Sequence, residues 1–362
     1  MKGPRTFRAP GRVNLIGEHT DYNLGFVLPI ALHLSTYVET SPSPDGLLRI
    51  SSEFRNITLS WAPEETATLE PRKQWTDYVA GVARELALLG VPLEALELKI
   101  RSDVPEGSGL SSSAALEVSS ALAFLQGREF DRLELARLCQ RAETGFVGLP
   151  SGIMDQYVSL FGQPRAAIRI DCRSLEHITV TLPDDVQIIA INSMVKHELG
   201  ASAYRIRVQE CAIASEAMGV ASLRDATLAM ILKTPMPGEV RKRARHVVTE
   251  NLRVESFVEA AAAGDLARMG QLFVESHRSM QQDYAITADE VDFLVDEAIT
   301  KEGCYGARMT GGGFGGCTVN LVAPAAVDAF EQAMRDAYKQ RFNIDPNIFR
   351  CIPGPGAAEI TK

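Results

Sequence analysis

A glycine- and serine-rich loop, placed between an expected strand and an expected helix, is the feature that most constrains this chain. Residues 96–101 alternate apolar and polar side chains as a strand does, and residues 114–125 carry Ala, Leu and Val at helical spacing. Glycine lets a ligand approach the backbone, hydroxyls can donate hydrogen bonds, and a helix N-terminus offers unpaired N–H groups. The loop is therefore interpreted as a phosphate site formed by Gly107, Ser108, Gly109, Leu110, Ser111, Ser112 and Ser113.

A simpler interpretation of this loop stays open, namely a turn that only caps a structural helix. The segment contains no lysine, and the G-x-x-x-x-G-K-[ST] pattern of a Walker A loop is not present in the sequence. Other segments have to decide between the two interpretations.

The segment at residues 9–23 is dense in polar groups and is expected as a loop between strands at 6–9 and 26–31. It contains Arg12, Glu18, His19 and Asp21. These groups either pair with one another in the interior, because unpaired buried charges are costly, or form a polar cup. A cup of carboxylates, an imidazole and a guanidinium suits a polyhydroxylated ligand that becomes negatively charged.

Three further candidates lie on expected helices. A helix beginning at Trp75 places Tyr78 on the same face, an arrangement typical of core packing, with a platform beside an adenine ring as the functional alternative. A second helix, expected at residues 131–147 with Asp131 as its N-cap, carries Glu143 near its end.

Asp155 follows a Gly-Leu-Pro-Ser-Gly turn at the start of another expected helix. It either caps or pairs there, or it is the carboxylate beside an attacking hydroxyl that phosphoryl transfer to an alcohol requires. The residues alone leave these two roles open.

The second half of the chain changes character and indicates a second lobe. Expected strands at 166–170, 178–182 and 186–192 give way to a largely helical run at 201–300, in which Thr287 and Glu290 fit a capping box. Residues 309–317 contain five glycines and satisfy G-x-G-x-x-G, but they lead into a strand, whereas a dinucleotide fingerprint opens a helix. This segment is expected to pack against a ligand or against the phosphate loop.

Composition narrows the class of protein. The chain has 362 residues, enough for two lobes, with 46% hydrophobic and 23% charged residues. Its net charge of −9 argues against a nucleic-acid partner, and no apolar run reaches the length of a membrane span. The N-terminus lacks a signal-peptide core, and six scattered cysteines fit reduced thiols, so a cytoplasmic protein is expected.

Three segments together, residues 9–29, 105–115 and 308–318, resemble the three ordered motifs of the GHMP small-molecule kinases. Residues 11–22 look like the galactokinase signature, and the similarity in order and spacing extends over essentially the full chain. The resemblance implies an α+β, bilobal fold: an N-terminal lobe similar to domain 2 of ribosomal protein S5 (residues 1–185) and a C-terminal ferredoxin-like lobe with inserted helices (residues 186–362). It also implies ATP and Mg²⁺ as cofactors, and we expect a monomer.

By the same resemblance, each candidate residue has an implied role. Arg12 and Asp155 would be catalytic, and the galactose would be surrounded by Arg12, Glu18, His19, Asp21, Gly152, Asp155 and Tyr204. Residues 107–113 would hold the triphosphate, Trp75 and Tyr78 would lie near the base, and Ser113 with Glu143 would hold Mg²⁺, which prefers hard oxygen ligands. The third segment, from Thr310 to Gly316, would close against the phosphate loop and help shape the sugar site.

The sequence also departs from the family pattern. Val208 stands where a second arginine is usual after the tyrosine, Thr144 and Ser151 replace common His and Cys, and Arg308 replaces a frequent Lys. None of these positions has a proposed catalytic role. The expected activity is ATP-dependent phosphorylation of the anomeric hydroxyl of galactose; a related sugar such as N-acetylgalactosamine, or a non-catalytic sugar and ATP sensor, are the alternatives.

Overall fold

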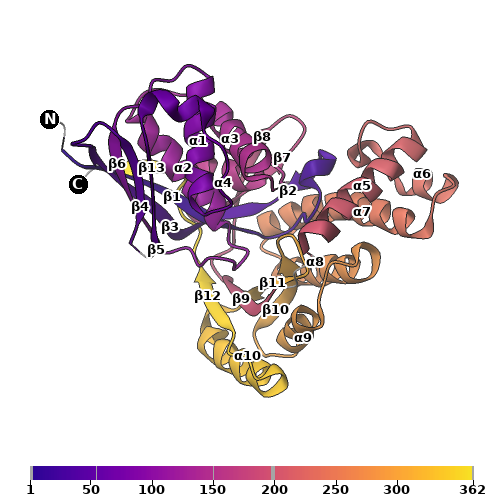
Figure 1. Cartoon of the computed structure of the whole chain (residues 1–362). Coiled ribbons are helices and arrows are strands. Elements are labelled where there is room, and N and C mark those ends of the chain that lie inside the picture. Colours follow the sequence, from indigo (N-terminus) through magenta and orange to yellow (C-terminus); the bar gives the residue numbers. More distant parts are fainter. Residues whose placement is uncertain (1–2, 54, 150, 197–199, 361–362) are drawn as a thin grey trace.

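In the computed structural model, which describes residues 3–53, 55–149, 151–196 and 200–360, the first lobe is built on a six-stranded sheet (Figure 1). Neighbouring strands are antiparallel except for the parallel pair β4 and β6. The order across the sheet is β13 (Ala358–Ile360), β1 (Arg5–Asn14), β3 (Pro29–Pro42), β6 (Leu96–Ser102), β4 (Leu48–Ser52) and β5 (Arg55–Trp61).

Strand β1 is longer than the sequence predicts. The segment at 9–23 was expected as a loop, but its first part, through Asn14, continues the strand, so that prediction is wrong there. Pro10 and Gly11 conceal the alternation, and the register between β1 and β3 shifts between Pro10 and Arg12. The consequence is that Arg12 projects from a sheet strand and not from a loop.

Four helices pack together against one face of this sheet: α1 (Thr76–Leu88), α2 (Ser112–Leu125), α3 (Arg132–Arg141) and α4 (Met154–Phe161). The predicted N-cap of α3 is confirmed, because Asp131 Oδ1 accepts the Glu134 N–H at 2.8 Å. A π-helical turn (Ala142–Val147) follows α3. A small sheet of β2 (Phe26–Val27), β7 (Ala166–Asp171) and β8 (Glu176–Thr181) completes the lobe.

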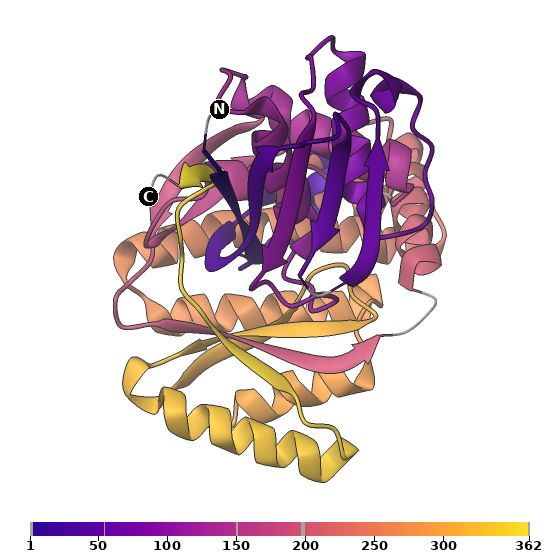
Figure 2. The ribbon, with the colours of Figure 1, turned by 60° about the vertical axis from the view of Figure 1, so that its left-hand side comes forward.

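The second lobe contains a four-stranded antiparallel sheet (Figure 2). Its order is β10 (Cys304–Thr310), β11 (Gly315–Val322), β9 (Gln187–Lys196) and β12 (Asn347–Cys351). Alternate residues of β9 face opposite sides: Ile189 packs with α9 (Asp289–Ala298) and α10 (Val327–Phe342), whereas Ile188 packs with α7 (Gly238–Ala263) and α8 (Leu266–Ser279). Helices α5 (Gly200–Met218) and α6 (Leu228–Lys233) lie farther out, beside α7.

One hydrophobic cluster spans both lobes. Val13 and Leu28 of the first lobe share it with Phe257 of α7 and Leu321 of β11, all of them buried. Strand β13 also returns from the end of the chain to pair with β1. The lobes therefore meet through a packed interior, which fixes the loops between them.

One local prediction in the second lobe is wrong, the capping box ahead of α9. The capping box at Thr287 does not form, because Ala288 occupies the N-cap position of α9 and the Thr287 hydroxyl donates to Asp292 Oδ2 at 3.2 Å. The aspartate one turn into the helix competes successfully for this hydroxyl. In the part of the chain that the structure describes, no helix is long and apolar enough to cross a membrane.

Candidate active site

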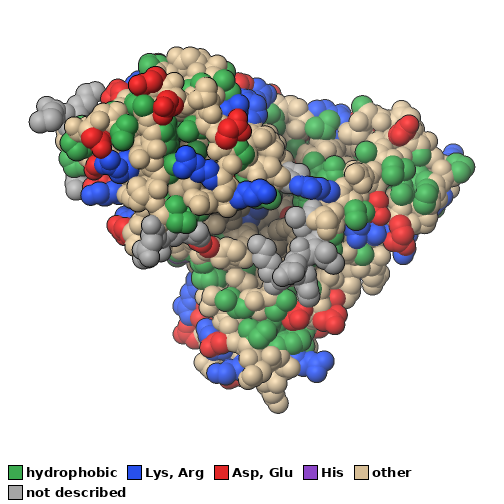
Figure 3. Space-filling model, in the orientation of Figure 1, with side chains coloured by type: hydrophobic (Ala, Val, Ile, Leu, Met, Phe, Trp, Pro, Cys, Tyr) green, Lys and Arg blue, Asp and Glu red, His purple; other side chains and the backbone are tan. Residues whose placement is uncertain are grey.

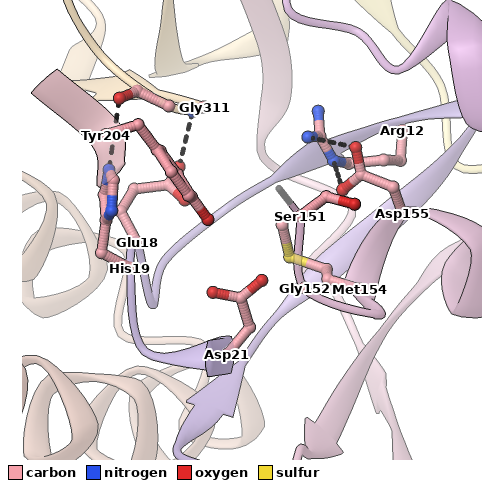
Figure 4. A pocket seen from close by; sticks show the side chains of 11 residues that line it. Arg12, Glu18, His19, Asp21, Ser151, Gly152, Met154, Asp155, Tyr204 and Gly311 are labelled. Atoms are coloured by element: carbon pink, nitrogen blue, oxygen red, sulfur yellow. Dashed lines mark hydrogen bonds and ion pairs between the residues drawn. The ribbon is translucent and has the colours of Figure 1, made fainter. Parts of the chain in front are cut away.

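The catalytic candidates Arg12 and Asp155 form one ion pair, although they come from β1 and α4. Arg12 Nε donates to Asp155 Oδ1 and Arg12 Nη2 to Asp155 Oδ2, both at 2.8 Å (Figure 4). Arg12 is only 7% exposed. Two parallel hydrogen bonds from a planar guanidinium fix both the position and the plane of the carboxylate.

This pair is also tied to the phosphate loop. Arg12 Nη1 donates to the Gly109 carbonyl at 2.6 Å, and the Arg12 backbone N–H donates to the Leu110 carbonyl at 2.9 Å. The neighbouring Gly11 makes this approach possible, since a Cβ there would lie 2.5 Å from the Leu110 carbonyl oxygen. The loop and the strand therefore lie in direct contact at the ion pair.

Glu18 joins the first polar segment to the glycine-rich third segment. Its carboxylate accepts from Asn14 Nδ2 at 2.7 Å and from the Gly311 N–H at 3.0 Å. Arg308, which is completely buried, lies 3.4 Å from Glu18 Oε1 and donates to the Leu15 carbonyl at 2.6 Å. Arg308 has no role among the sequence predictions; its only signal in the sequence is the departure from lysine.

His19 is in contact with the aromatic rings of Tyr22, Tyr204 and Tyr284. Its Nε2 lies 3.2 Å from the Gly312 carbonyl and its Nδ1 lies 2.8 Å from the Tyr22 hydroxyl, while the Tyr204 ring lies 5.1 Å away between centroids. Burial lowers the pKa of His19 to about 3, so the imidazole is neutral at pH 7. A carbonyl can only accept, so Nε2 carries the proton and Nδ1 accepts from Tyr22.

Asp21 lies opposite the ion pair, on a short 3₁₀ turn (Asp21–Asn23) (Figure 4). Burial raises the pKa of its carboxyl to about 6, with the negative charges of Asp155 and Glu18 as smaller contributions. Gly152 is next to it: a Cβ on Gly152 would lie only 1.7 Å from Asp21 Oδ2. The carboxylate therefore occupies space that only a glycine at position 152 leaves free.

These residues surround a single cavity of about 170 Å³. All seven predicted sugar-binding residues line it: Arg12, Glu18, His19, Asp21, Gly152, Asp155 and Tyr204. Four further residues line it: Gly311 and Gly312, which belong to the segment expected to help shape the sugar site, and Ser151 and Met154, which were not predicted as lining residues.

A second cavity, of about 240 Å³, lies beside the phosphate loop. Trp75, Tyr78, Gly107, Ser112 and Ser113 line it, together with residues of β3, β4 and β6. Apolar and polar side chains are mixed here, as a base and a phosphate chain require. In the space-filling view, Lys and Arg side chains lie along the upper rim of the hollow between the lobes (Figure 3).

Two further loop residues, Ser108 and Leu110, face inward, toward protein atoms, whereas Gly109 is exposed. Ser108 is buried and its hydroxyl donates to the Pro105 carbonyl at 2.7 Å, and Leu110 is buried as well. The Ser108 carbonyl accepts from Cys317 Sγ at 2.6 Å. The end of the third segment thus contacts the phosphate loop, as the sequence predicts.

The two metal candidates lie together. Ser113 is close enough to Glu143 to act against the rise in the pKa of its carboxyl, and Glu143 Oε2 accepts from Ser151 Oγ at 2.6 Å and from Gln156 Nε2 at 2.9 Å. Burial raises the pKa of Glu143, so a bound cation would offset an unfavourable environment for its charge. Among the described residues, no group of three or more His, Cys, Asp or Glu is placed to hold a metal ion.

Glu117, on α2, is a buried neighbour that is not among the predicted site residues. Its Oε2 accepts from Gln156 Nε2 at 2.9 Å, and its Oε1 has no hydrogen-bond partner. Burial, and then the charge of Glu143, raise its pKa well above the usual value. A glutamate within an Ala, Leu and Val helix was the signal that could have identified it.

Three models of known families match parts of this chain. Residues 77–163 match the GHMP kinases N terminal domain, residues 257–340 match the GHMP kinases C terminal domain, and residues 2–42 match the galactokinase galactose-binding signature. The bilobal α+β fold is that of a GHMP kinase.

Relatives that align over nearly the whole chain show which family of GHMP kinases this chain resembles. The chain is 45% identical to a galactokinase of Chloroflexus aurantiacus and 41% identical to one of Roseiflexus sp., with 98% of this chain covered in both cases and 93% and 92% of the relatives. The crystal structure of Lactococcus lactis galactokinase complexed with galactose superposes with a TM-score of 0.94 at 34% identity, covering 99% of this chain and 96% of that one. The chain belongs to the galactokinase family and is a kinase.

A more distant structure shows how far the fold extends. A mevalonate kinase superposes with a TM-score of 0.68 at 17% identity, covering 96% of this chain and 99% of the other. At that identity the likeness is one of fold alone.

Proposed function

We propose that this kinase transfers the γ-phosphoryl group of ATP to the anomeric hydroxyl of D-galactose, giving α-D-galactose 1-phosphate and ADP. The observation that carries the proposal is the Arg12–Asp155 pair: it lines the sugar cavity and, through Gly109, touches the phosphate loop. Acceptor and donor would therefore meet at this pair.

The sugar would occupy the 170 Å³ cavity. Carboxylates of Glu18 and Asp21 can accept hydrogen bonds from hydroxyls, and the neutral His19 presents a polar edge beside them. The Tyr204 ring closes one side of the cavity (Figure 4). This combination of acceptors and a flat apolar ring suits the alternating polar edges and C–H face of a hexose.

The nucleotide would lie along the second cavity and the phosphate loop. Trp75 and Tyr78 would flank the base, while Gly107, Ser112 and Ser113 would lie beside the phosphates, at the N-terminus of α2. Ser113 and Glu143 are the residues that fit a magnesium ion, with phosphate oxygens completing its ligands. When bound, the ion would neutralise charge on the transferring phosphoryl group.

In the chemical step, the galactose oxygen would form a bond to the γ-phosphorus as the bond to the ADP oxygen breaks. The transition state is loose, so positioning and charge stabilisation matter more than early removal of the proton. Asp155 would accept the hydroxyl proton late in the step. Arg12 would hold that carboxylate in place and offset negative charge near the phosphate loop.

The first test is ADP release by the purified protein with ATP and Mg²⁺ against D-galactose, N-acetylgalactosamine, glucose, arabinose and mevalonate. Turnover with galactose is expected. Turnover only with N-acetylgalactosamine would change the substrate, and silence with every acceptor would favour a non-catalytic sensor.

The role of Asp155 is tested by Asp155→Asn. The variant should lose roughly 10²- to 10⁴-fold in kcat, the range for a general base, while its affinity for ATP stays within about twofold. Asp184→Asn, which removes an exposed carboxylate that pairs with Arg165, is the matched control. Unchanged turnover in Asp155→Asn would refute the assigned role.

The proposal also includes the predicted cytoplasmic location and monomeric state. Light scattering during size-exclusion chromatography measures the mass of the particle directly, and a mass near 39.4 kDa is expected.

A further inference from the structure

Ser111 occupies an unusual position in the phosphate loop. It is the residue before α2, where a serine side chain normally accepts from a backbone N–H in the first helical turn. Here the Ser111 side chain makes no such cap, and its backbone is left-handed, with φ 59°. A non-glycine residue in this conformation is uncommon and persists when the surroundings hold it there.

The Ser111 hydroxyl is directed at the catalytic carboxylate. Ser111 Oγ donates to Asp155 Oδ2 at 2.5 Å, and the residue is 9% exposed. Ser111 does not line the second cavity, whereas the next two serines do. The left-handed backbone thus separates Ser111 from its neighbours and turns its side chain toward α4.

This hydroxyl completes the set of donors on Asp155. Oδ1 accepts from Arg12 Nε at 2.8 Å, and Oδ2 accepts from both Arg12 Nη2 at 2.8 Å and Ser111 Oγ at 2.5 Å. With two donors on Oδ2 and one on Oδ1, Oδ1 keeps more free acceptor capacity. The oxygen best able to receive a proton is therefore Oδ1.

We infer that Ser111 is a positioning residue for Asp155 and not a ligand of the nucleotide phosphates. Its hydroxyl occupies Oδ2, reinforces the orientation that Arg12 gives the carboxylate and leaves Oδ1 for the attacking hydroxyl of the sugar. Because Ser111 belongs to the phosphate loop, the same loop that meets the nucleotide also orients the base. This inference rests on the proposed function.

Ser111→Gly is the sharpest variant, because glycine adopts a left-handed backbone without strain while losing the hydroxyl. We expect kcat to fall about 10- to 100-fold, the effect of one hydrogen bond to a charged group. The KM values for ATP and sugar, and the Kd for Mg²⁺·ADP by calorimetry, should stay within about twofold. Ser111→Ala, which removes the same hydroxyl, should match this kcat with a lower Tm.

The matched control is Ser119→Ala, because Ser119 is a buried serine within α2 whose hydroxyl donates to the Ala115 carbonyl at 2.7 Å. It should keep wild-type kcat. A double-mutant cycle then separates positioning from general structure: in the Asp155→Asn background, Ser111→Gly should cost less than threefold.

Three results would overturn the positioning role. A tenfold weaker Kd for Mg²⁺·ADP with unchanged kcat would make Ser111 a phosphate ligand. The second result is wild-type kcat in both Ser111 variants. The third is that the losses in kcat from Ser111→Gly and Asp155→Asn are fully additive. Inactivity of the wild-type protein with every sugar would overturn the proposed function together with this inference. An active wild type with equally active variants would overturn the inference alone.

Discussion

Substituting Gly152 by alanine tests whether the sugar cavity depends on the position of Asp21. The new Cβ would lie 1.7 Å from Asp21 Oδ2, whereas ordinary van der Waals contact begins at 3.4 Å. The nearest atoms are all in the Asp21 side chain, so the carboxylate has to withdraw by about 1.7 Å, the difference between those distances. A hydrogen bond of about 2.7 Å to a sugar hydroxyl would then exceed 4 Å and be lost.

The expected loss follows from this displacement. A hydrogen bond to a charged group contributes about 1.5–3 kcal/mol, which corresponds to roughly 10- to 150-fold in affinity. Asp21 does not contact Asp155 through a hydrogen bond, so the change should appear in the KM for galactose with little effect on kcat. Steady-state ADP release at saturating ATP measures both constants.

Two further variants separate an effect through Asp21 from a general effect of the added methyl group. Gly238→Ala adds the same methyl group in open space, with no atom within 4 Å, and should leave KM unchanged. If Gly152 acts through Asp21, then Gly152→Ala should raise KM less than threefold in an Asp21→Ala background. An equal increase in both backgrounds, or no increase in the wild type, would refute this reasoning.

Three further predictions concern buried charges. Because burial raises the pKa of Asp21 to about 6, protonation of this carboxyl should weaken sugar binding below that pH. The KM for galactose should be constant above pH 7 and rise up to about tenfold per pH unit below pH 6. The Asp21→Asn variant should flatten this profile. The raised pKa of Glu117 means that the stability from its protonated form is present at low pH and lost as pH rises; Glu117→Gln should therefore have a higher Tm than wild type at pH 8 and an equal one at pH 4. Arg308→Met removes a completely buried counter-charge of Glu18 and Glu250 and should cost about 3–5 kcal/mol in urea unfolding, so a loss under 1 kcal/mol would contradict the assigned pairing.

Much of this fold could be predicted from local patterns. The strand before the phosphate loop and the helix after it were recognisable because side-chain period depends only on neighbouring residues. The same holds for the Asp131 cap of α3. Where the pattern was interrupted, as by Pro10 and Gly11 in β1, local reasoning ended the strand too early. The capping box at Thr287 failed because Asp292 competes for the hydroxyl.

The candidate residues of the site were also identifiable in the sequence, because dense polar groups beside glycine turns are costly without a ligand or a partner. Their arrangement was not. Arg12 and Asp155 are 143 positions apart, and Glu18 and Gly311 are 293 apart, so no local period relates them. Glu117 is recognisable in the sequence as a glutamate in an apolar helix, but that its Oε1 lacks a hydrogen-bond partner is visible only once α2 and α4 pack together.

The sequence by itself therefore determined which chemical groups the chain has available and on which kind of element each one lies. Only the tertiary structure decided which of two adjacent serines faces the nucleotide cavity and which faces Asp155. It also decided that Gly152 leaves room for a carboxylate from a segment more than a hundred residues away. The physical reason is that the repeat of a helix or strand fixes only the direction in which a side chain points from its own element. Contacts between elements depend on how the burial of apolar faces brings those elements together.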